Sequence, residues 1–470
     1  MAARRVVVIG GGISGLAAAW ELTGGAAPRV GAPAVTLLEA SSELGGPLQS
    51  ADIGGRTVDL GPDGFLGRRS EAVDLCAEAG MAATLAPIAA RGASVWSRGR
   101  LRTLPEGQAL GIPTRFWPTA RSGILGVRGA LGLARDAVLP RPDTRGPIGD
   151  RAIGPLVARK LGQRVVDTLV DPLIGGIHAG SVDDMSAAAT FPPLLAAAQR
   201  RGGLMRALRA EVAAPRPDGP PLFWSLEGGM ASLVDALATG LRGRGAGVCV
   251  SSPAERLERS SSGGWVVTYA DGIMEADAVV LATPAPATAA LLRPHDDEAA
   301  GLLDAIDYAS VVLVTFRAST ENVPDALQGT GFLVPRRTQH KGREPWAVTA
   351  CTYLDRKWPH LARDGEMLLR ASLGRIDDTR AAEWSDQEVA ERAWEELGPL
   401  MGVIGAPMSA RVTRFTDAFP QYRVHHLLRT AGVESALARI GGVAVAGAAY
   451  HGVGIPACIA SGRAAAHSLL

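Results

Sequence analysis

Short hydrophobic runs and a glycine-rich turn mark the start of the chain. Residues 5–9 and 34–38 are rich in Val, Ile and Leu, which is the pattern of strands buried on both faces of a parallel sheet. Residues 16–22 lie between them, follow the glycines and have the composition of a helix. Because strand, turn, helix and strand make one βαβ unit, we expect the fold to begin as a parallel α/β sheet.

The pattern changes in the next part of the chain. Residues 89–209 are rich in Ala, Leu and Arg, and residues 153–169 and 191–208 have the amphipathic spacing of helices. Prolines between residues 140 and 147 interrupt this pattern. We therefore expect a mainly helical insertion over residues 89–209.

After residue 210 the hydrophobic runs become short again. We expect strands at residues 222–226, 247–250, 265–269, 274–276, 278–282, 311–316, 331–334, 347–353, 367–373 and 443–446. We expect helices at residues 231–241, 386–397 and 458–468. The four alternating runs between residues 311 and 373 predict an antiparallel sheet.

Composition argues against several classes of partner. The 470-residue chain has 48 basic and 47 acidic residues, so its formal net charge of +1 provides no field that attracts nucleic acid. Its four cysteines form no CxxC pair, and the histidines lack the spacing of metal ligands. We expect reduced thiols and no metal site.

Two stretches bear on the location of the protein. The apolar run after residue 5 is too short for a secretory signal peptide and ends in glycines. Residues 441–462 are uncharged and long enough to span a bilayer, but they include six glycines, Pro456 and His451. We expect a cytoplasmic protein. Because the mean hydropathy of +0.13 is somewhat high, peripheral membrane contact stays open.

A dinucleotide-binding motif follows the first strand. Gly10, Gly12 and Gly15 have the spacing GxGxxG, which provides a tight turn, close approach to a pyrophosphate and a helix N-terminus. Glu39 ends the second strand at the distance where an acid accepts hydrogen bonds from ribose hydroxyls. Since a carboxylate repels a 2′-phosphate, FAD or NAD fits better than NADP.

The segment after Glu39 adds a second glycine pair, Gly45-Gly46. The extended motif resembles that of the flavoprotein superfamily of amine oxidases, phytoene desaturases and protoporphyrinogen oxidases, and this resemblance favours FAD. An arginine often follows the glycine pair in that superfamily, whereas this chain has Pro47. The difference weakens an amine-oxidase interpretation but leaves flavin binding intact, because the backbone makes most of the contact.

Further segments resemble the porphyrinogen-oxidising branch of the superfamily. They are residues 61–66 (GPDGFL), 171–180 (DPLIGGIHAG), 185–192, 419–422 (FPQY) and 447–459 (GAAYHGVGIPACI). Together they extend the resemblance over essentially the whole chain.

The resemblance implies a set of cofactor-binding residues. They are Gly10, Gly11, Gly12, Ile13, Ser14, Gly15, Glu39, Ala40, Gly45, Gly46, Pro47, Gly61, Pro62, Asp63, Gly64, Ala254, Ala448, Val453, Gly454 and Ile455. Arg68, Arg69 and His178 are candidates for substrate binding, since arginine suits the carboxylates of propionates. A solvated loop for the arginines and a structural role for His178 are the alternatives.

The implied reaction is the oxidation of coproporphyrinogen III to coproporphyrin III by FAD and dioxygen, with release of hydrogen peroxide, in haem biosynthesis. Protoporphyrinogen IX is the alternative substrate. A desaturase, an amine oxidase or a non-catalytic flavoprotein that hands porphyrin to a partner enzyme are further alternatives, because fold alone does not decide function. No obligate catalytic acid or base is implied.

The predicted fold class is α/β: a Rossmann-like FAD-binding domain with an inserted mixed-sheet substrate domain and a mainly helical insertion. Residues 1–88, 210–285 and 419–470 form the FAD-binding domain in this prediction. Residues 89–209 form the helical insertion, where we would look for membrane or partner contacts, and residues 286–418 form the substrate-binding antiparallel sheet.

Overall fold

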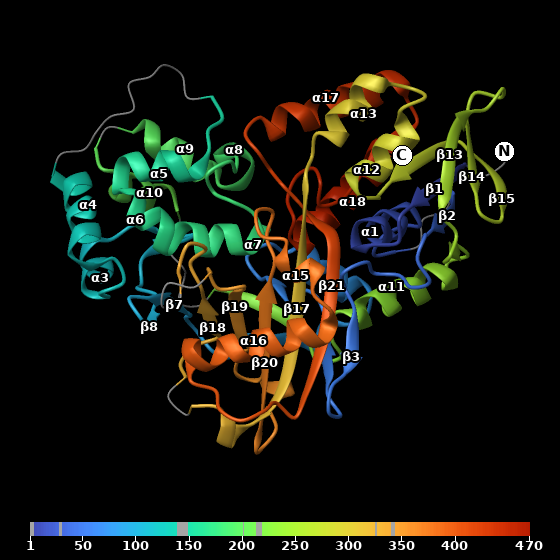
Figure 1. The fold of residues 1–470 in the computed structure, drawn as a ribbon. Coiled ribbons are helices and arrows are strands. Elements are labelled where there is room, and N and C mark those ends of the chain that lie inside the picture. The colour runs from blue at the N-terminus through green and yellow to red at the C-terminus, as the bar shows by residue number, and fades with distance from the viewer. Residues whose placement is uncertain are drawn as a thin grey trace. The chain divides into compact units, whose positions relative to one another are not determined.

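The computed structural model describes residues 4–27, 31–138, 149–200, 202–212, 219–324, 327–339 and 344–470 (Figure 1). The chain divides into two compact units. The first unit comprises Met1–Pro87, Pro220–Asp307 and Leu427–Leu470, and the second comprises Ile88–Gly219 and Tyr308–His426. The predicted proline break at residues 140–147 lies outside the described residues.

A five-stranded parallel sheet forms the centre of the first unit. Its strands, in spatial order, are β12 (Gly247–Cys249), β2 (Ala34–Leu38), β1 (Arg5–Ile9), β16 (Ala278–Leu281) and β22 (Val443–Val445). The strand order reverses between β1 and β16. In open α/β sheets, ligands bind beside the carboxyl ends of the strands at such a switch point. The prediction of a parallel sheet that begins with β1 and β2 is confirmed.

Two helices of the first unit approach each other unusually closely. α1 (Ile13–Leu22) packs along α18 (Ile455–Leu469), and a Cβ atom on Gly462 would overlap the carbonyl oxygen of Ser14. Farther along, His467 of α18 lies beside Glu21 of α1. The two helices therefore run parallel, so their N-termini lie at the same end.

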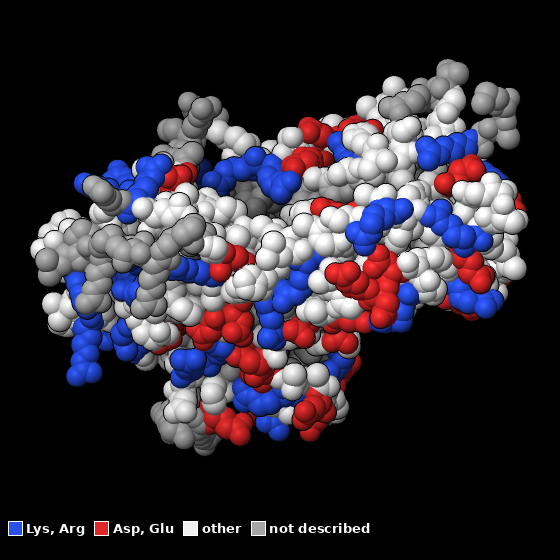
Figure 2. Space-filling model, turned by 90° about the horizontal axis from the view of Figure 1, so that it is seen from above, with Lys and Arg blue, Asp and Glu red and all other residues white. Residues whose placement is uncertain are grey.

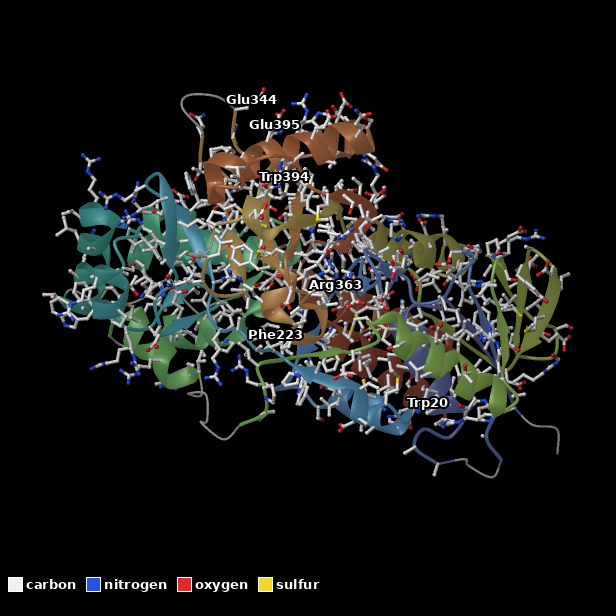
Figure 3. All side chains as sticks on the ribbon, turned by 90° about the horizontal axis from the view of Figure 1, so that it is seen from below. Trp20, Phe223, Glu344, Arg363, Trp394 and Glu395 are labelled. Carbon is white, nitrogen blue, oxygen red and sulfur yellow. The ribbon has the colours of Figure 1, made fainter. Side chains whose placement is uncertain are left out.

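Further elements complete the first unit. The strands are β3 (Ser50–Asp52), β4 (Thr57–Asp59), β5 (Phe65–Leu66), β6 (Leu85–Pro87), β11 (Phe223–Leu226), β13 (Ala254–Arg259), β14 (Trp265–Tyr269) and β15 (Gly272–Ala276). The helices are α2 (Glu71–Glu78), η1 (Ala82–Thr84), α11 (Ala231–Gly243), α12 (Ala285–Leu292), α13 (Asp297–Asp304) and α17 (His426–Ile440). Trp20 of α1, labelled in Figure 3, packs so closely on α11 that only a glycine fits at residue 240.

A seven-stranded sheet dominates the second unit. Its strands, in spatial order, are β21 (Ser409–Pro420), β17 (Tyr308–Ser319), β20 (Glu366–Leu373), β19 (Val348–Tyr353), β18 (Gly331–Leu333), β7 (Ser94–Ser97) and β8 (Arg100–Thr103). All neighbouring pairs are antiparallel except β18 and β7. The prediction of antiparallel strands between residues 311 and 373 is confirmed.

The helical prediction for residues 89–209 needs correction at its beginning. Two strand pairs precede the helices: β7 with β8, and β9 (Gln108–Ala109) with β10 (Ile112–Pro113). The sequence also failed to indicate β21. Because β8 and β21 are the edge strands of the large sheet and carry exposed arginines, their hydrophobic signal is weak.

The remaining helices of the second unit are mostly short, apart from the 16-residue helix that begins at Asp386 as predicted. They are α3 (Phe116–Arg121), α4 (Gly126–Val138), α5 (Ile153–Leu161), α6 (Gln163–Val165), the π-helix η2 (Val166–Gly175), α7 (Gly176–His178), α8 (Ala187–Thr190), α9 (Pro192–Gln199), α10 (Leu204–Glu211), η3 (Thr320–Asn322), α14 (Leu354–Lys357), η4 (Pro359–Leu361), α15 (Arg380–Glu383) and α16 (Asp386–Met401). The single helices expected at 153–169 and 191–208 are each broken. Gly162 and Gly202 lie at the breaks and have positive φ angles of 95° and 109°, which favour glycine.

Charged side chains are mixed on the surface. Figure 2 shows basic and acidic groups interspersed over one face, in agreement with the near-zero net charge. Within the described residues, no helix combines the length and the hydropathy needed to cross a bilayer. The hydrophobic core of the first unit lies between its parallel sheet and helices α1, α11 and α18.

Candidate functional site

Four loops meet at the carboxyl ends of the parallel strands. The N–H of Gly10, after β1, donates to Leu38 O at 2.8 Å, and the N–H of Ala282, after β16, donates to Ile9 O at 2.7 Å. The loops after β2 and β22 are tied to neighbouring strands in the same way, by backbone hydrogen bonds of Glu39 and Ala446. The motif glycines, Glu39 and the C-terminal loop, which we define as residues 447–454, therefore approach one edge of the sheet.

The three motif glycines have different surroundings. A Cβ atom on Gly10, whose φ is 107°, would lie 2.6 Å from Ala282 O, and one on Gly15 would overlap Gly10 O. A Cβ atom on Gly12 would meet nothing within 4 Å. The first and third glycines are thus required by the protein's own packing, whereas the second leaves open space beside the backbone. This is the arrangement that a dinucleotide pyrophosphate needs.

Two helix N-termini face this edge of the sheet. α1 begins after Gly12 and α18 begins after Gly454, and neither helix has a side-chain cap or an acidic residue in its first turn. Because the two helices run parallel in contact, their free N–H groups and partial positive charges lie at the same end. Such a pair of helix ends stabilises a bound anion.

Glu39 is held against the glycine turn. Its Oε2 accepts a hydrogen bond from the N–H of Gly11 at 2.6 Å, and its Oε1 accepts from the N–H and the hydroxyl of Ser41, each at 2.8 Å. Ala40, next to it, is exposed. The carboxylate is thus oriented at the end of β2, where a ribose-binding acid belongs.

The second glycine pair lies against the first motif. The N–H of Gly45 donates to Gly11 O at 2.9 Å, and Gly45 and Gly46 have φ angles of 100° and 58°. A Cβ atom on Gly45 would lie 2.9 Å from Leu48 O. Pro47 is exposed beside the pair. Backbone rather than side chains therefore lines this part of the edge.

Ala254 lies near the Glu39 loop. It begins β13, and the N–H of Ser252, two residues earlier, donates to Glu39 O at 2.8 Å. The sequence motif around Ala254 carries no signal of its own, so its place near the acid becomes evident only from the fold.

The structure explains how residues 61–64 are positioned. They follow β4, which ends at Asp59, a buried carboxylate that accepts hydrogen bonds from Ser50 Oγ at 2.7 Å and from the N–H of Met230 at 2.6 Å. Asp63 itself is half-buried, and Pro62 is exposed. Asp59 was not predicted, although an acid between the apolar residues Val58 and Leu60 was a signal that could have indicated it.

The C-terminal loop reaches the N-terminus of α18. The N–H of Gly447 donates to Ser461 Oγ at 3.1 Å, and both Ala448 and Val453 are half-buried. His451 does not turn inward: it is exposed and its Nε2 lies 2.6 Å from Glu434 Oε1. The loop therefore offers mainly backbone groups.

Cys458, in the first turn of α18, lies close to the glycine turn. Burial raises the pKa of its thiol to about 11, against a smaller opposing effect of the Ser14 hydrogen bond. Burial therefore favours the neutral thiol at physiological pH and does not activate Cys458 as a nucleophile.

The three candidate substrate residues have different environments. Arg68 is exposed and makes no hydrogen bond or ion pair to the described residues, whereas Arg69 pairs with Glu71 in the first turn of α2 and thereby lowers the pKa of Glu71. His178 belongs to the second unit, where burial lowers its pKa to about 4. Arg68 and Arg69 belong to the first unit.

The buried His178 predicts a pH dependence of stability. Above about pH 6.5 the imidazole is neutral in both states, but between about 6.5 and 4 the unfolded chain binds a proton that the folded chain does not. As the pH drops through this window, the free energy of unfolding decreases. At about pH 5 this group accounts for a decrease of about 2 kcal/mol. We expect His178→Asn to reduce the loss of thermal midpoint between about pH 7.5 and 5, measured by circular dichroism.

The matched control for this experiment is Ile177→Asn, because Ile177 precedes His178, is 47% exposed and carries no titratable group. It should leave the pH dependence close to that of the parent protein. An equal pH dependence in the parent protein and in His178→Asn would contradict the assignment of a buried neutral imidazole.

Acidic, histidine and thiol side chains are the possible metal ligands over the described ranges. No group of three or more His, Cys, Asp or Glu residues capable of holding an ion occurs in the described part of the chain. The edge of the parallel sheet, with its glycines and helix ends, therefore remains the arrangement to be explained.

Comparison with known proteins identifies the family of the chain. The profile of the flavin containing amine oxidoreductase family matches residues 13–470. The chain belongs to this family. Coproporphyrinogen III oxidase of Bacillus subtilis (strain 168) is 32% identical over 476 residues, which cover 99% of this chain and 98% of that protein. Coproporphyrinogen III oxidase of Mycobacterium tuberculosis (strain H37Rv) is 36% identical over 472 residues, with 99% and 97% covered.

A solved structure from Exiguobacterium sp. 255-15, assigned as a protoporphyrinogen oxidase, has 32% sequence identity and a TM-score of 0.87. The match covers 100% of this chain and 99% of that one. As a member of the flavin-containing family, the chain is an FAD-dependent oxidoreductase of the α/β class. The open space at Gly12 and the two helix ends fit that cofactor. The individual cofactor contacts stay predictions.

Proposed function

We propose that the protein oxidises coproporphyrinogen III to coproporphyrin III with FAD and dioxygen. The observation that carries this proposal is the full-length similarity to several coproporphyrinogen III oxidases, at 32–36% identity for the two described above. In the balanced reaction the porphyrinogen loses six hydrogen atoms in three two-electron rounds. Three dioxygen molecules accept them and become three molecules of hydrogen peroxide.

The proposed cofactor contacts follow from the geometry of the sheet edge. The open space at Gly12 and the N-terminus of α1 would hold the pyrophosphate, and Glu39 would accept hydrogen bonds from the ribose. The residues around Asp63 and the C-terminal loop would contact the flavin ring. The N-terminus of α18 would stabilise negative charge on that ring, because its free N–H groups carry a partial positive charge.

The chemistry of the substrate limits what the protein must supply. When bound, FAD supplies a two-electron acceptor that dioxygen reoxidises. Each meso carbon of a porphyrinogen is flanked by electron-rich pyrroles that delocalise positive charge, so no nucleophile or triad is needed. The protein's own task is to bind, orient and enclose the macrocycle.

The proposed substrate contacts differ in charge. Arg68 is the stronger candidate for a propionate carboxylate, because it is exposed and makes no ion pair among the described residues, whereas Arg69 already pairs with Glu71. His178 is neutral at physiological pH, so its proposed role is a hydrogen bond and not a charge pair.

Location and partners form a further part of the proposal. We propose a cytoplasmic location, and we propose a partner enzyme of haem synthesis as the acceptor of the product. Cell fractionation would test the location. Recovery with the membrane fraction would instead support peripheral contact.

The deciding experiment compares two substrates. The holoenzyme is mixed under air with coproporphyrinogen III or with protoporphyrinogen IX, and the initial rates are followed by porphyrin fluorescence. We expect kcat/KM to favour coproporphyrinogen III by about tenfold or more, which corresponds to about 1.4 kcal/mol between the two transition states.

Other outcomes point to other functions. Equal rates, or a preference for protoporphyrinogen IX, would support the second candidate function, which the similarity to the Exiguobacterium structure favours. If neither porphyrinogen reduces the flavin under anaerobic conditions, the porphyrinogen assignment is wrong. The remaining candidate functions are then an amine oxidase, a desaturase or a non-catalytic flavoprotein.

A further inference from the structure

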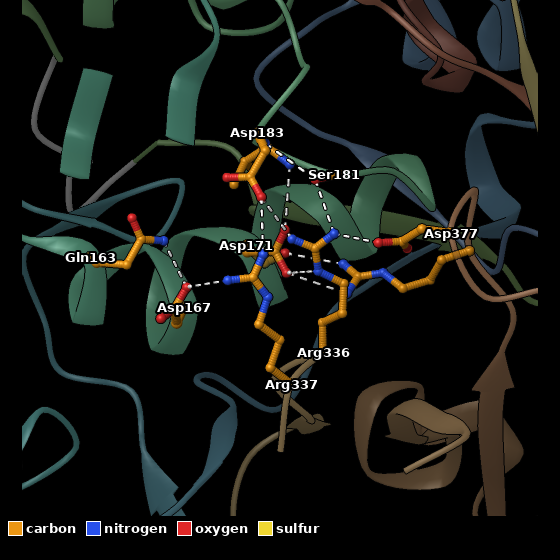
Figure 4. Close-up of polar contacts among 10 residues, drawn as sticks. Gln163, Asp167, Asp171, Ser181, Asp183, Arg336, Arg337 and Asp377 are labelled. Carbon is orange, nitrogen blue, oxygen red and sulfur yellow. Dashed lines mark hydrogen bonds and ion pairs between the residues drawn. The ribbon is translucent and has the colours of Figure 1, made fainter. Parts of the chain in front are cut away.

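An ionic network with a buried centre surrounds the segment that contains His178. All of its members lie in the second unit, and Figure 4 shows them. The π-helix η2 carries Asp167 and Asp171 and continues directly into α7, which ends at His178. π-helical segments are rare and occur frequently at functional sites. The network thus begins immediately before the predicted substrate residue.

Asp171 and Arg375 form the buried centre of the network. Their side chains are only 4% and 3% exposed. Arg375 Nη1 donates to Asp171 Oδ2 at 3.3 Å, and Arg375 Nη2 donates to the carbonyl oxygen of Asp171 at 3.3 Å. The N–H of Val182 also donates to Asp171, at 3.4 Å. Removing one partner of such a pair leaves a buried charge without compensation, which is strongly unfavourable.

Arg336 extends the network to the other end of the same segment. Its Nε lies 3.5 Å from Asp171 Oδ2, its Nη1 donates to Ser181 Oγ at 3.1 Å, and its Nη2 donates to Asp183 at 3.0 Å. It also pairs with Asp377. The chain from residue 171 to residue 183 is therefore held by arginines before and after His178 (Figure 4).

The backbone around His178 is fixed at several points. The N–H of Gly180 donates to Gly175 O at 2.9 Å, and the N–H of Ile376, next to Arg375, donates to Ala179 O at 2.8 Å. Gln421 Nε2 donates to His178 O at 2.9 Å. A Cβ atom on Gly175 would overlap Arg375 Nη2, so the guanidinium fits only beside a glycine.

Two features of this segment are unfavourable by themselves. Ala179 has a left-handed backbone with φ of 49°, which costs a non-glycine residue about 1 kcal/mol or more. His178 as a residue is 9% exposed, and the Nδ1 of its imidazole has no hydrogen-bond partner among the described residues. Such features persist only where the surrounding structure imposes them, and they concentrate at functional sites.

We infer that Asp171 and Arg375 are positioning residues for His178, holding its imidazole for a hydrogen bond with the porphyrinogen. The inference rests on the proposed function. It assigns a role to Asp171, which was expected only as part of segment 171–180, and to Arg375, for which the sequence indicated no role. Neither residue is expected to touch the substrate. Their effect on catalysis is exerted through the backbone and side chain of His178.

The test is a double-mutant cycle in the holoenzyme. Asp171→Asn, His178→Ala and the double variant are compared for kcat, KM and the anaerobic rate of flavin reduction by coproporphyrinogen III. We expect each single variant to lower kcat/KM about tenfold, and the double variant to be no worse than His178→Ala, because both changes remove the same interaction. Reoxidation of chemically reduced flavin by dioxygen should be unchanged, since it needs no substrate.

The matched control is Glu366→Gln. Glu366 forms a two-point pair with Arg317 between β17 and β20 of the same unit, at 2.8 and 2.5 Å. Like Asp171→Asn, the substitution Glu366→Gln neutralises a carboxylate that pairs with arginine. We expect it to leave the kinetic constants unchanged. If Asp171→Asn does not fold, Arg375→Lys, which keeps the charge but loses the two-point contact, takes its place in the same cycle.

The outcomes separate this inference from the proposed function. If the parent enzyme oxidises coproporphyrinogen III and Asp171→Asn behaves like Glu366→Gln, the positioning role is wrong while the function stands. Additive effects of Asp171→Asn and His178→Ala would also overturn the positioning role. If the parent enzyme oxidises neither porphyrinogen, the proposed function fails and the inference fails with it.

Discussion

Gly12→Val is expected to give a folded protein that does not retain FAD. Gly12 has φ of −68° and ψ of 174°, an extended conformation that valine adopts readily, and its Cβ would meet nothing within 4 Å. The new side chain would instead occupy the space at the N-terminus of α1 where we place the pyrophosphate. We expect FAD binding to weaken at least about a hundredfold, which corresponds to about 2.7 kcal/mol.

The measurement is the ratio of flavin absorbance to polypeptide after purification, followed by FAD titration of the apoprotein. Stability is compared between apoproteins, because bound FAD stabilises the folded state. Gly301→Val is the control, since Gly301 lies in α13 of the same unit and also has open space around it. A yellow Gly12→Val protein with full FAD occupancy would show that the glycine turn does not hold the pyrophosphate.

Gly462→Ala is expected to destabilise the first unit, although the same change usually strengthens a helix. Alanine is favoured over glycine inside a helix by about 1 kcal/mol. In α18, however, the added Cβ would overlap Ser14 O of α1 and lie 3.1 Å from Ala18 N, so the two helices must separate. Overpacking of this kind costs about 1–3 kcal/mol. Because the overlapped atom belongs to the backbone and cannot rotate away, we place the cost at about 3 kcal/mol, the upper end of this range. The expected net loss is therefore about 2 kcal/mol.

Thermal unfolding of the apoproteins would show this loss as a midpoint lowered by roughly 4–8 °C. Because α1 and α18 both begin at the sheet edge, their separation should also weaken FAD binding. Gly301→Ala supplies the matched control: the same substitution in open space within α13 should raise the midpoint slightly. A Gly462→Ala protein as stable as Gly301→Ala would contradict the close contact between α1 and α18.

The sequence predicted those elements most accurately whose structure depends on residues close together in the chain. The hydrophobic runs of β1 and β2 and the glycine turn between them are local patterns, and the structure has both strands at the predicted residues. The glycine spacing with Glu39 was sufficient to predict a dinucleotide site, because motif and chemistry lie within one βαβ unit. Edge strands such as β8 and β21 were not predicted, because exposed arginines interrupt the alternation of apolar and polar residues along them.

The sequence by itself therefore determined the family, the flavin and the first βαβ unit, since these depend on short-range order. Only the tertiary structure decided which distant residues meet. Gly462 lies far along the chain from Ser14, and Arg375 lies far from Asp171, yet each pair is in contact. A single sequence contains no periodicity that records such pairs, because the free energy of the contact arises only after both elements have formed and packed.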